Sequence, residues 1–63
     1  MRLSTVEAKA QRILGGGTLR YHLDTEEVIF TTSDGQRMLL GSDLSDANRR
    51  LDELSRKRQN RNE

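Results

Sequence analysis

The chain has 63 residues, of which 32% are apolar and 33% are charged, and it contains no cysteine. This length gives one small domain, and the lack of cysteine excludes a disulfide framework and a thiolate metal site. No run approaches the roughly 20 apolar residues that a membrane-spanning helix needs, and the first residues lack the apolar core of a secretory signal. We therefore expect a protein that is not secreted and has no transmembrane segment.

The net charge of +1 hides an uneven distribution along the chain. Residues 1–48 hold five Lys or Arg and seven Asp or Glu, whereas residues 49–63 hold six and three. A mildly acidic body is thus followed by a basic C-terminal segment. Such a segment suits contacts with the phosphates of DNA, and it equally suits a solubilising tail, so the residue types alone leave both alternatives open.

An amphipathic helix is predicted before the three glycines at 15–17. Its apolar residues recur at helical spacing and are Leu3, Val6, Ala10, Ile13 and Leu14. Ser4 and Glu7 have the spacing of a capping box, in which each side chain bonds the backbone amide of the other. Gly15 is expected to end the helix in a left-handed conformation.

The alternating segment Thr18–Leu23 is predicted to be a strand, followed by a turn over residues 24–27. That turn pairs Tyr21 with Phe30 and Leu23 with Val28. The apolar residues of this strand therefore join one face of a sheet.

The segment Glu27–Leu40 is predicted to be a β-hairpin around a two-residue Asp34-Gly35 turn, because Asp-Gly suits a type I′ turn. This turn pairs Thr32 with Arg37 and Phe30 with Leu39. The core face is then expected to carry Leu19, Tyr21, Leu23, Val28, Phe30 and Leu39. The opposite face is expected to carry Arg20, His22, Ile29, Thr31, Met38 and Leu40.

A second helix is predicted after Gly41, with Ser42 or Asp43 as its N-terminal cap. Its apolar seam consists of Leu44, Ala47, Leu51 and Leu54. We expect a folded domain over residues 1–55 and a mobile basic tail over residues 56–63, with fraying from Arg56 to Arg58. The predicted fold class is therefore α+β: a helix, a three-stranded antiparallel meander, and a C-terminal helix with a basic tail.

No catalytic or cofactor-binding motif stands out, so we expect no enzyme, no cofactor, no metal and no small-molecule substrate. His22 is the only histidine, and a solvent-facing strand position is its expected role. Two other sets of residues are candidate sites. The predicted protein interface is Ile29, Met38 and Leu40. The predicted contacts with nucleic acid or with a protein ring are Arg49, Arg50, Arg56, Lys57, Arg58 and Arg61.

Parts of the sequence resemble the gpW-like family of phage head–tail joining proteins. The resemblance lies in Val28-Ile29-Phe30, Asp34 to Met38, Ser42-Asp43-Leu44, Leu51 to Leu54 and the Arg-rich end, about half of the chain. It implies a structural adaptor of virion assembly that docks as a homo-oligomer on a larger protein ring. It also implies a location in the cytoplasm of a bacterial host or in the virion.

Two other functions remain open. The first is a small DNA-associated regulator that uses the basic C-terminal helix and tail. The second is a small phage inhibitor that binds one host protein through its sheet. Only the first of these predicts tight, salt-sensitive DNA binding.

Overall fold

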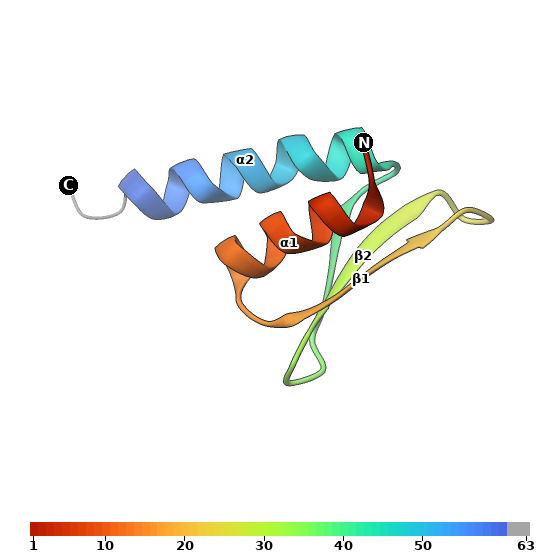
Figure 1. Cartoon of the computed structure of the whole chain (residues 1–63), viewed down its shortest axis with the longest axis horizontal. Helices are drawn as coiled ribbons and strands as arrows, with labels where there is room; N and C mark the ends of the chain where they lie inside the picture. The colour runs from red at the N-terminus through yellow and green to blue at the C-terminus, as the bar shows by residue number, and fades with distance from the viewer. Residues whose placement is uncertain (61–63) are drawn as a thin grey trace.

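The computed structural model describes residues 1–60 and contains two helices and three strands (Figure 1). In chain order these are α1 (Leu3–Leu14), β1 (Gly17–His22), β2 (Glu27–Thr32), β3 (Arg37–Gly41) and α2 (Leu44–Asn60). The strands form an antiparallel meander in the order β1-β2-β3. The predicted α+β class and the predicted order of the elements are confirmed.

Both helices pack on the same face of the sheet, side by side (Figure 1). The fully buried residues form one cluster drawn from every element: Val6, Ala10, Leu19, Val28, Phe30, Leu40, Ala47 and Leu51. Lys9 on α1 joins the two helices, because its Nζ donates to Asn48 Oδ1 at 2.9 Å and forms an ion pair with Asp52. Within residues 1–60, no helix or strand covers the opposite face of the sheet.

The helix α1 ends at the predicted residue, Gly15, although with a ψ of −177° rather than the predicted left-handed helical conformation, and it begins differently. Gly15 has φ 101°, and its amide donates to the Gln11 carbonyl at 3.0 Å. The predicted capping box is wrong, because Arg2 is the N-cap residue, without a side-chain cap bond, and Ser4 lies inside the helix. The carboxylate of Glu7 instead accepts a hydrogen bond from the Leu19 amide at 2.9 Å. This bond ties α1 to the neighbouring edge strand.

The pairing of β1 with β2 differs from the predicted register by two residues. Leu19 lies opposite Phe30, and Tyr21 lies opposite Val28. The chain reverses over Leu23–Glu26, and Glu26 adopts a left-handed φ of 56°. A shift of two keeps each side chain on its predicted face, but Leu23 falls in the turn. Its predicted place in the core is therefore wrong, and it is 76% exposed.

The pairing of β2 with β3 differs by one residue, because the loop is longer than predicted. Thr32 donates its amide to the Gln36 carbonyl at 2.8 Å, which leaves a three-residue loop, Ser33–Gly35. Gly35 has φ 93°, whereas Asp34 has no positive φ, so the turn is not type I′. A hydrogen bond from the Thr32 hydroxyl, followed by one from the Gln36 backbone, lowers the pKa of Asp34 below its usual value.

This one-residue shift exchanges the two faces of β3. Met38 lies opposite Phe30, and Leu39 lies opposite Ile29. Leu40 follows Met38 by two residues, so it lies on the same helix-facing side, and it is 4% exposed. A bulge between Val28 and Ile29 then pairs Val28 with Gly41. The prediction that Leu39 faces the core and that Met38 and Leu40 face away from it is wrong.

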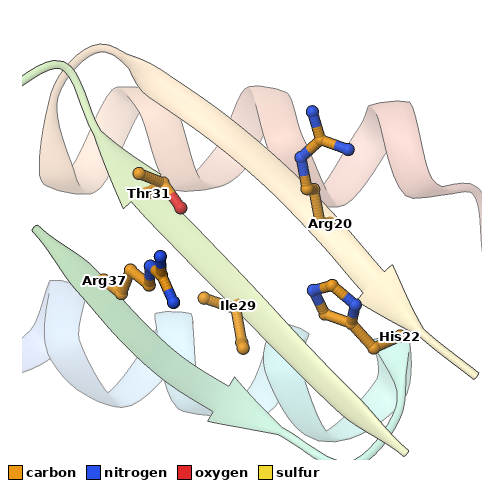
Figure 2. Close-up of a pocket in the computed structure, with 5 residues that line it drawn as sticks. All are labelled: Arg20, His22, Ile29, Thr31 and Arg37. Carbon is orange, nitrogen blue, oxygen red and sulfur yellow. The ribbon is translucent and has the colours of Figure 1, made fainter. Parts of the chain in front are cut away.

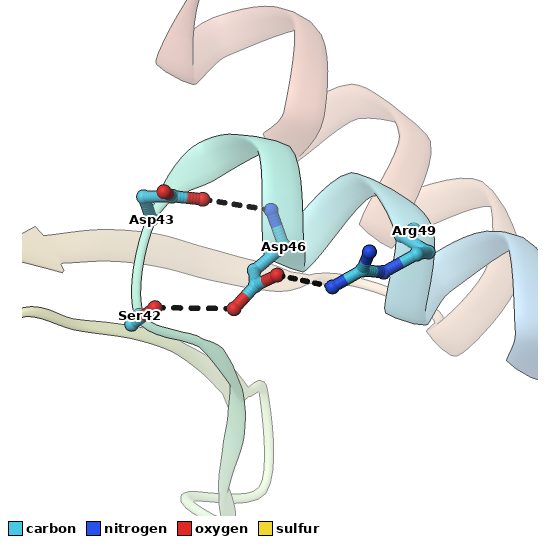
Figure 3. Close-up of polar contacts among 4 residues, drawn as sticks. All are labelled: Ser42, Asp43, Asp46 and Arg49. Carbon is cyan, nitrogen blue, oxygen red and sulfur yellow. Dashed lines mark hydrogen bonds and ion pairs between the residues drawn. The ribbon is translucent and has the colours of Figure 1, made fainter.

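The start of α2 lies directly against the end of β3. A Cβ atom on Gly41 would lie 2.5 Å from Asp46 Cβ and 3.0 Å from the Ala47 amide nitrogen. Only glycine allows this approach. Of the two predicted caps, Asp43 fills the position, because its Oδ1 accepts a bond from the Asp46 amide at 2.8 Å (Figure 3). Ser42 instead donates its hydroxyl to Asp46 Oδ2 at 3.1 Å.

The C-terminal helix is longer than predicted. It runs for 17 residues to Asn60 and extends past the end of α1 (Figure 1). The helix therefore continues through Arg56–Arg58, where its end was predicted, and the mobility of the basic segment stays a prediction. Arg, Lys and Gln are good helix formers, and positive charge at a helix C-terminus is favourable. The remainder of the predicted tail, residues 61–63, lies outside the described residues.

Gly17 is required by close packing, and its substitution gives a direct test of the fold. A Cβ atom there would lie 2.6 Å from Phe30 Cζ and would also meet the Thr31 carbonyl oxygen. We expect Gly17→Ala to lower the free energy of unfolding by about 1–3 kcal/mol, measured by urea denaturation. Gly16→Ala is the matched control, since nothing lies within 4 Å of its Cβ position. Equal effects of the two substitutions would contradict this packing.

Candidate protein interface

The face of the sheet that turns away from the helices is here called the outer face. The registers of β1, β2 and β3 assign to it Thr18, Arg20, His22, Glu27, Ile29, Thr31, Arg37 and Leu39. The alternation of strand residues generates this set, because every second residue of each strand faces α1 and α2 instead. The sequence prediction already placed Arg20, His22, Ile29 and Thr31 here, and those four positions are confirmed.

The middle of the outer face is a hollow of about 320 Å³ (Figure 2). Its lining residues are Arg20, His22, Ile29, Thr31 and Arg37. Arg20 comes from β1 and Arg37 from β3, so the two guanidinium groups flank the β2 residues from opposite sides (Figure 2). The hollow therefore has an apolar and hydroxyl-bearing floor between two positive charges.

The positive charges of the outer face are not neutralised within the described part of the chain. Two ion pairs occur among the described residues, Lys9 with Asp52 and Arg49 with Asp46, and both lie on the helices. Neither Arg20 nor Arg37 takes part in them. An arginine without an internal partner is available for a carboxylate of another molecule, which it can bind through two parallel hydrogen bonds.

Apolar side chains lie beside these charges. Leu39 is 58% exposed and lies opposite the half-buried Ile29 in the same row of the sheet. An apolar centre with arginine beside it is typical of protein–protein interfaces, where arginine is enriched relative to the rest of the surface. The outer face thus has the composition of a surface that contacts another protein.

The predicted interface of Ile29, Met38 and Leu40 is not a surface patch. Leu40 is in the core, and Met38 lies on the helix-facing side of β3, where it is 37% exposed. Only Ile29 belongs to the outer face. The sequence did not assign Thr18, Glu27, Arg37 and Leu39 to this face, and for Arg37 and Leu39 the predicted register placed them on the opposite one. The faces of the β3 residues could be assigned only from the length of the β2–β3 loop. The run from Met38 to Leu40 is apolar throughout, so it does not show which of its residues face outward.

The basic residues of α2 do not form one stripe. Arg49 and Arg56 lie seven residues apart on one flank of the helix, and Arg50 and Lys57 share another flank, because a helix turns 100° per residue. An acidic residue lies next to one member of each pair: Asp46 binds Arg49 at 2.5 Å, and Glu53 follows Arg50 by three residues. Arg58 lies within α2, and Arg61 lies outside the described residues.

Other kinds of site find no support in residues 1–60. Among these residues, no three His, Cys, Asp or Glu side chains come close enough to hold a metal ion. No helix in the same range is long and apolar enough to cross a membrane. His22 is exposed at the end of β1, as expected from the sequence, and borders the hollow (Figure 2).

Comparison with known proteins adds no relative. No protein-family model matches the chain, and no curated protein and no solved structure matches it. The function is therefore inferred from this chain's own residues, above all from the outer face.

Two neighbouring leucines test the observed orientation of β3. Leu40→Ala removes a buried side chain, so we expect it to lower the free energy of unfolding by about 2–5 kcal/mol. Leu39→Ala removes an exposed one and should change that energy by less than about 0.5 kcal/mol. Urea denaturation of both variants checks the difference. A larger loss for Leu39→Ala would mean that β3 pairs in the other register.

Proposed function

We propose that this chain is a non-enzymatic assembly adaptor that acts through protein–protein contacts made by the outer face. One observation carries the proposal: exposed Leu39 and half-buried Ile29 lie beside Arg20 and Arg37 on a sheet face that no other element of residues 1–60 covers. Within that range neither arginine forms an ion pair. A domain this small gains little by leaving apolar surface exposed to water. Contact with another protein accounts for both the apolar centre and the charges beside it.

The more specific proposal is an adaptor of virion assembly that joins phage head and tail. It rests on the gpW-like resemblance, with which the order α1, β2–β3 hairpin and α2 is compatible. Strand β1 is an additional element that this order of helix, hairpin and helix does not include. In this proposal the outer face contacts a larger protein ring or a second subunit, and the end of α2 lies toward DNA or a neighbouring protein.

A second candidate is a small DNA-associated regulator. Exposed Arg56 and Lys57 favour it, because they lie in the last turns of α2, the helix that extends past the end of α1 (Figure 1). The alternation of Asp46 and Glu53 with the arginines of α2 speaks against a continuous phosphate-binding surface. A third candidate, an inhibitor of one host protein, would use the same outer face as a monomer.

Photo-cross-linking from the outer face tests the adaptor function. A photoreactive amino acid at position 39, introduced in the native cell, is expected to give a protein adduct of discrete mass. The same group at exposed Ser45, on α2, is the control and should give no such adduct. Adding Arg20→Glu and Arg37→Glu should reduce the adduct at position 39, because both charges that favour the contact are then reversed.

The absence of a protein adduct at position 39, together with tight DNA binding, would favour the DNA-associated regulator. The regulator would give no protein adduct at position 39 and would bind duplex DNA with an affinity that falls steeply with salt, about 0.9 in log K per log salt for each phosphate contacted. Fluorescence anisotropy of the full chain and of one ending at Ser55 measures this. If binding is strong and is lost with residues 56–63, the adaptor function is contradicted.

A further inference from the structure

The loop between β2 and β3 contains a pair of residues with covalent chemistry of its own. Asp34 is the only aspartate of the chain that precedes a glycine, and both Asp34 and Gly35 are exposed. Because glycine has no side chain, its amide nitrogen can closely approach the carboxyl group of the residue before it. Apart from its chain neighbours, nothing lies within 4 Å of the Cβ position of Gly35. The main chain at this pair is therefore open to reaction.

The reaction is an attack of the Gly35 amide nitrogen on the side-chain carboxyl carbon of Asp34, Cγ. A C–N bond forms, the C–OH bond of the carboxyl group breaks, and the amide proton leaves with the hydroxyl group as water. The product is a cyclic imide, a succinimide. Water then opens the ring. Cleavage at the main-chain carbonyl leaves the chain linked through Cγ as isoaspartate, whereas cleavage at Cγ restores aspartate.

In the folded chain, Thr32 engages both of the reacting groups. The Gly35 amide donates to the Thr32 carbonyl at 3.0 Å, and the Thr32 hydroxyl donates to the Asp34 carboxylate. The same hydroxyl oxygen accepts a bond from the Gln36 amide at 3.1 Å, which fixes its position. The bond from Thr32 is also the main reason why the pKa of Asp34 is lowered, so the carboxyl group rarely carries the proton that must leave with its hydroxyl.

We propose that Asp34 is a site of isoaspartate formation and that the hydrogen bonds of Thr32 restrain the reaction in the folded chain. Thr32 is a positioning residue here, because it acts by holding the Asp34 carboxylate and the Gly35 amide in other bonds. Opening of the loop, locally or with the whole domain, breaks these bonds and allows the attack. The inference concerns the loop alone and does not rest on the proposed function.

Conversion would alter the loop that determines the register of β3. Isoaspartate adds one carbon atom to the main chain between Asp34 and Gly35, and its carboxylate no longer sits where Thr32 holds it. The hydrogen bonds that close the loop Ser33–Gly35 then lose their geometry. The converted chain should therefore unfold at a lower urea concentration than the unconverted chain, after the two are separated by ion-exchange chromatography.

Incubation of the purified full chain at neutral pH tests the proposal. Isoaspartate at position 34 is quantified over time by mass spectrometry with electron-transfer fragmentation, which distinguishes it from aspartate. We expect it to form several-fold more slowly in the folded native chain than in the chain unfolded in guanidinium chloride. Thr32→Val, which replaces the hydroxyl group by a methyl group, should form it several-fold faster than the native chain under folding conditions.

Three further variants separate the restraint from a general loss of stability. Thr32→Ser keeps a hydroxyl group and should keep the slow rate. Thr31→Val removes a hydroxyl group from the neighbouring position on the outer face and should also react slowly. Gly17→Ala destabilises the fold away from the loop, so its rate measures the effect of unfolding alone. Circular dichroism checks that Thr32→Val is folded during the incubation.

Several results would overturn the proposal. If the unfolded chain forms no isoaspartate at position 34, Asp34 is not a modification site. Equal rates in the folded and the unfolded native chain would mean that the loop does not restrain the reaction. Equal rates in the native chain and folded Thr32→Val, or a fast Thr32→Ser, would remove Thr32 as the restraint. Equal urea midpoints of converted and unconverted chain would contradict the effect on the register.

Discussion

The register between β2 and β3 is the constraint on which the rest of the molecule depends. The loop Ser33–Gly35 has three residues, and Gly35 takes the left-handed conformation that such a loop requires. A two-residue loop would shift β3 by one position and exchange its faces. Leu40 would then be exposed and Leu39 buried, so the hydrophobic core and the outer face would both change composition.

The packing of the helices follows from that register. Leu40 lies in the core, and Gly41 then allows the first turn of α2 to lie against β3. Lys9 holds α1 to α2 through Asn48 and Asp52. Because both helices pack on one side, the other side of the sheet receives no cover from residues 1–60. The exposed position of the arginines on that side is therefore a consequence of the fold, and the proposed contact with another protein uses this face.

Much of the fold was predictable from periodicity and glycine placement. The two helices, the three strands, their order and the cap at Asp43 all follow from local patterns that tertiary packing supports. The failures occur where local sequence permits two geometries. Asp34-Gly35 fits a two-residue or a three-residue loop, and the bulge beside Val28 has no sequence signal. The residues of the outer face were predictable only in part, for the same reason. Strand alternation assigns Arg20 and Ile29 to this face correctly, whereas the face of Leu39 depends on the length of the loop Ser33–Gly35. The end of α2 was missed because a polar segment can be helical without an apolar seam.

Nuclear Overhauser contacts of the β3 methyl groups test this account most directly. We predict that the methyl protons of Leu40 show contacts to the Phe30 ring and to Leu51, because all three belong to the buried cluster. The methyl protons of Leu39 should show none to these groups and should show contacts to Ile29. Contacts from Leu39 to the Phe30 ring, with Leu40 lacking them, would mean that the strand is reversed and that the outer face is not the surface described above.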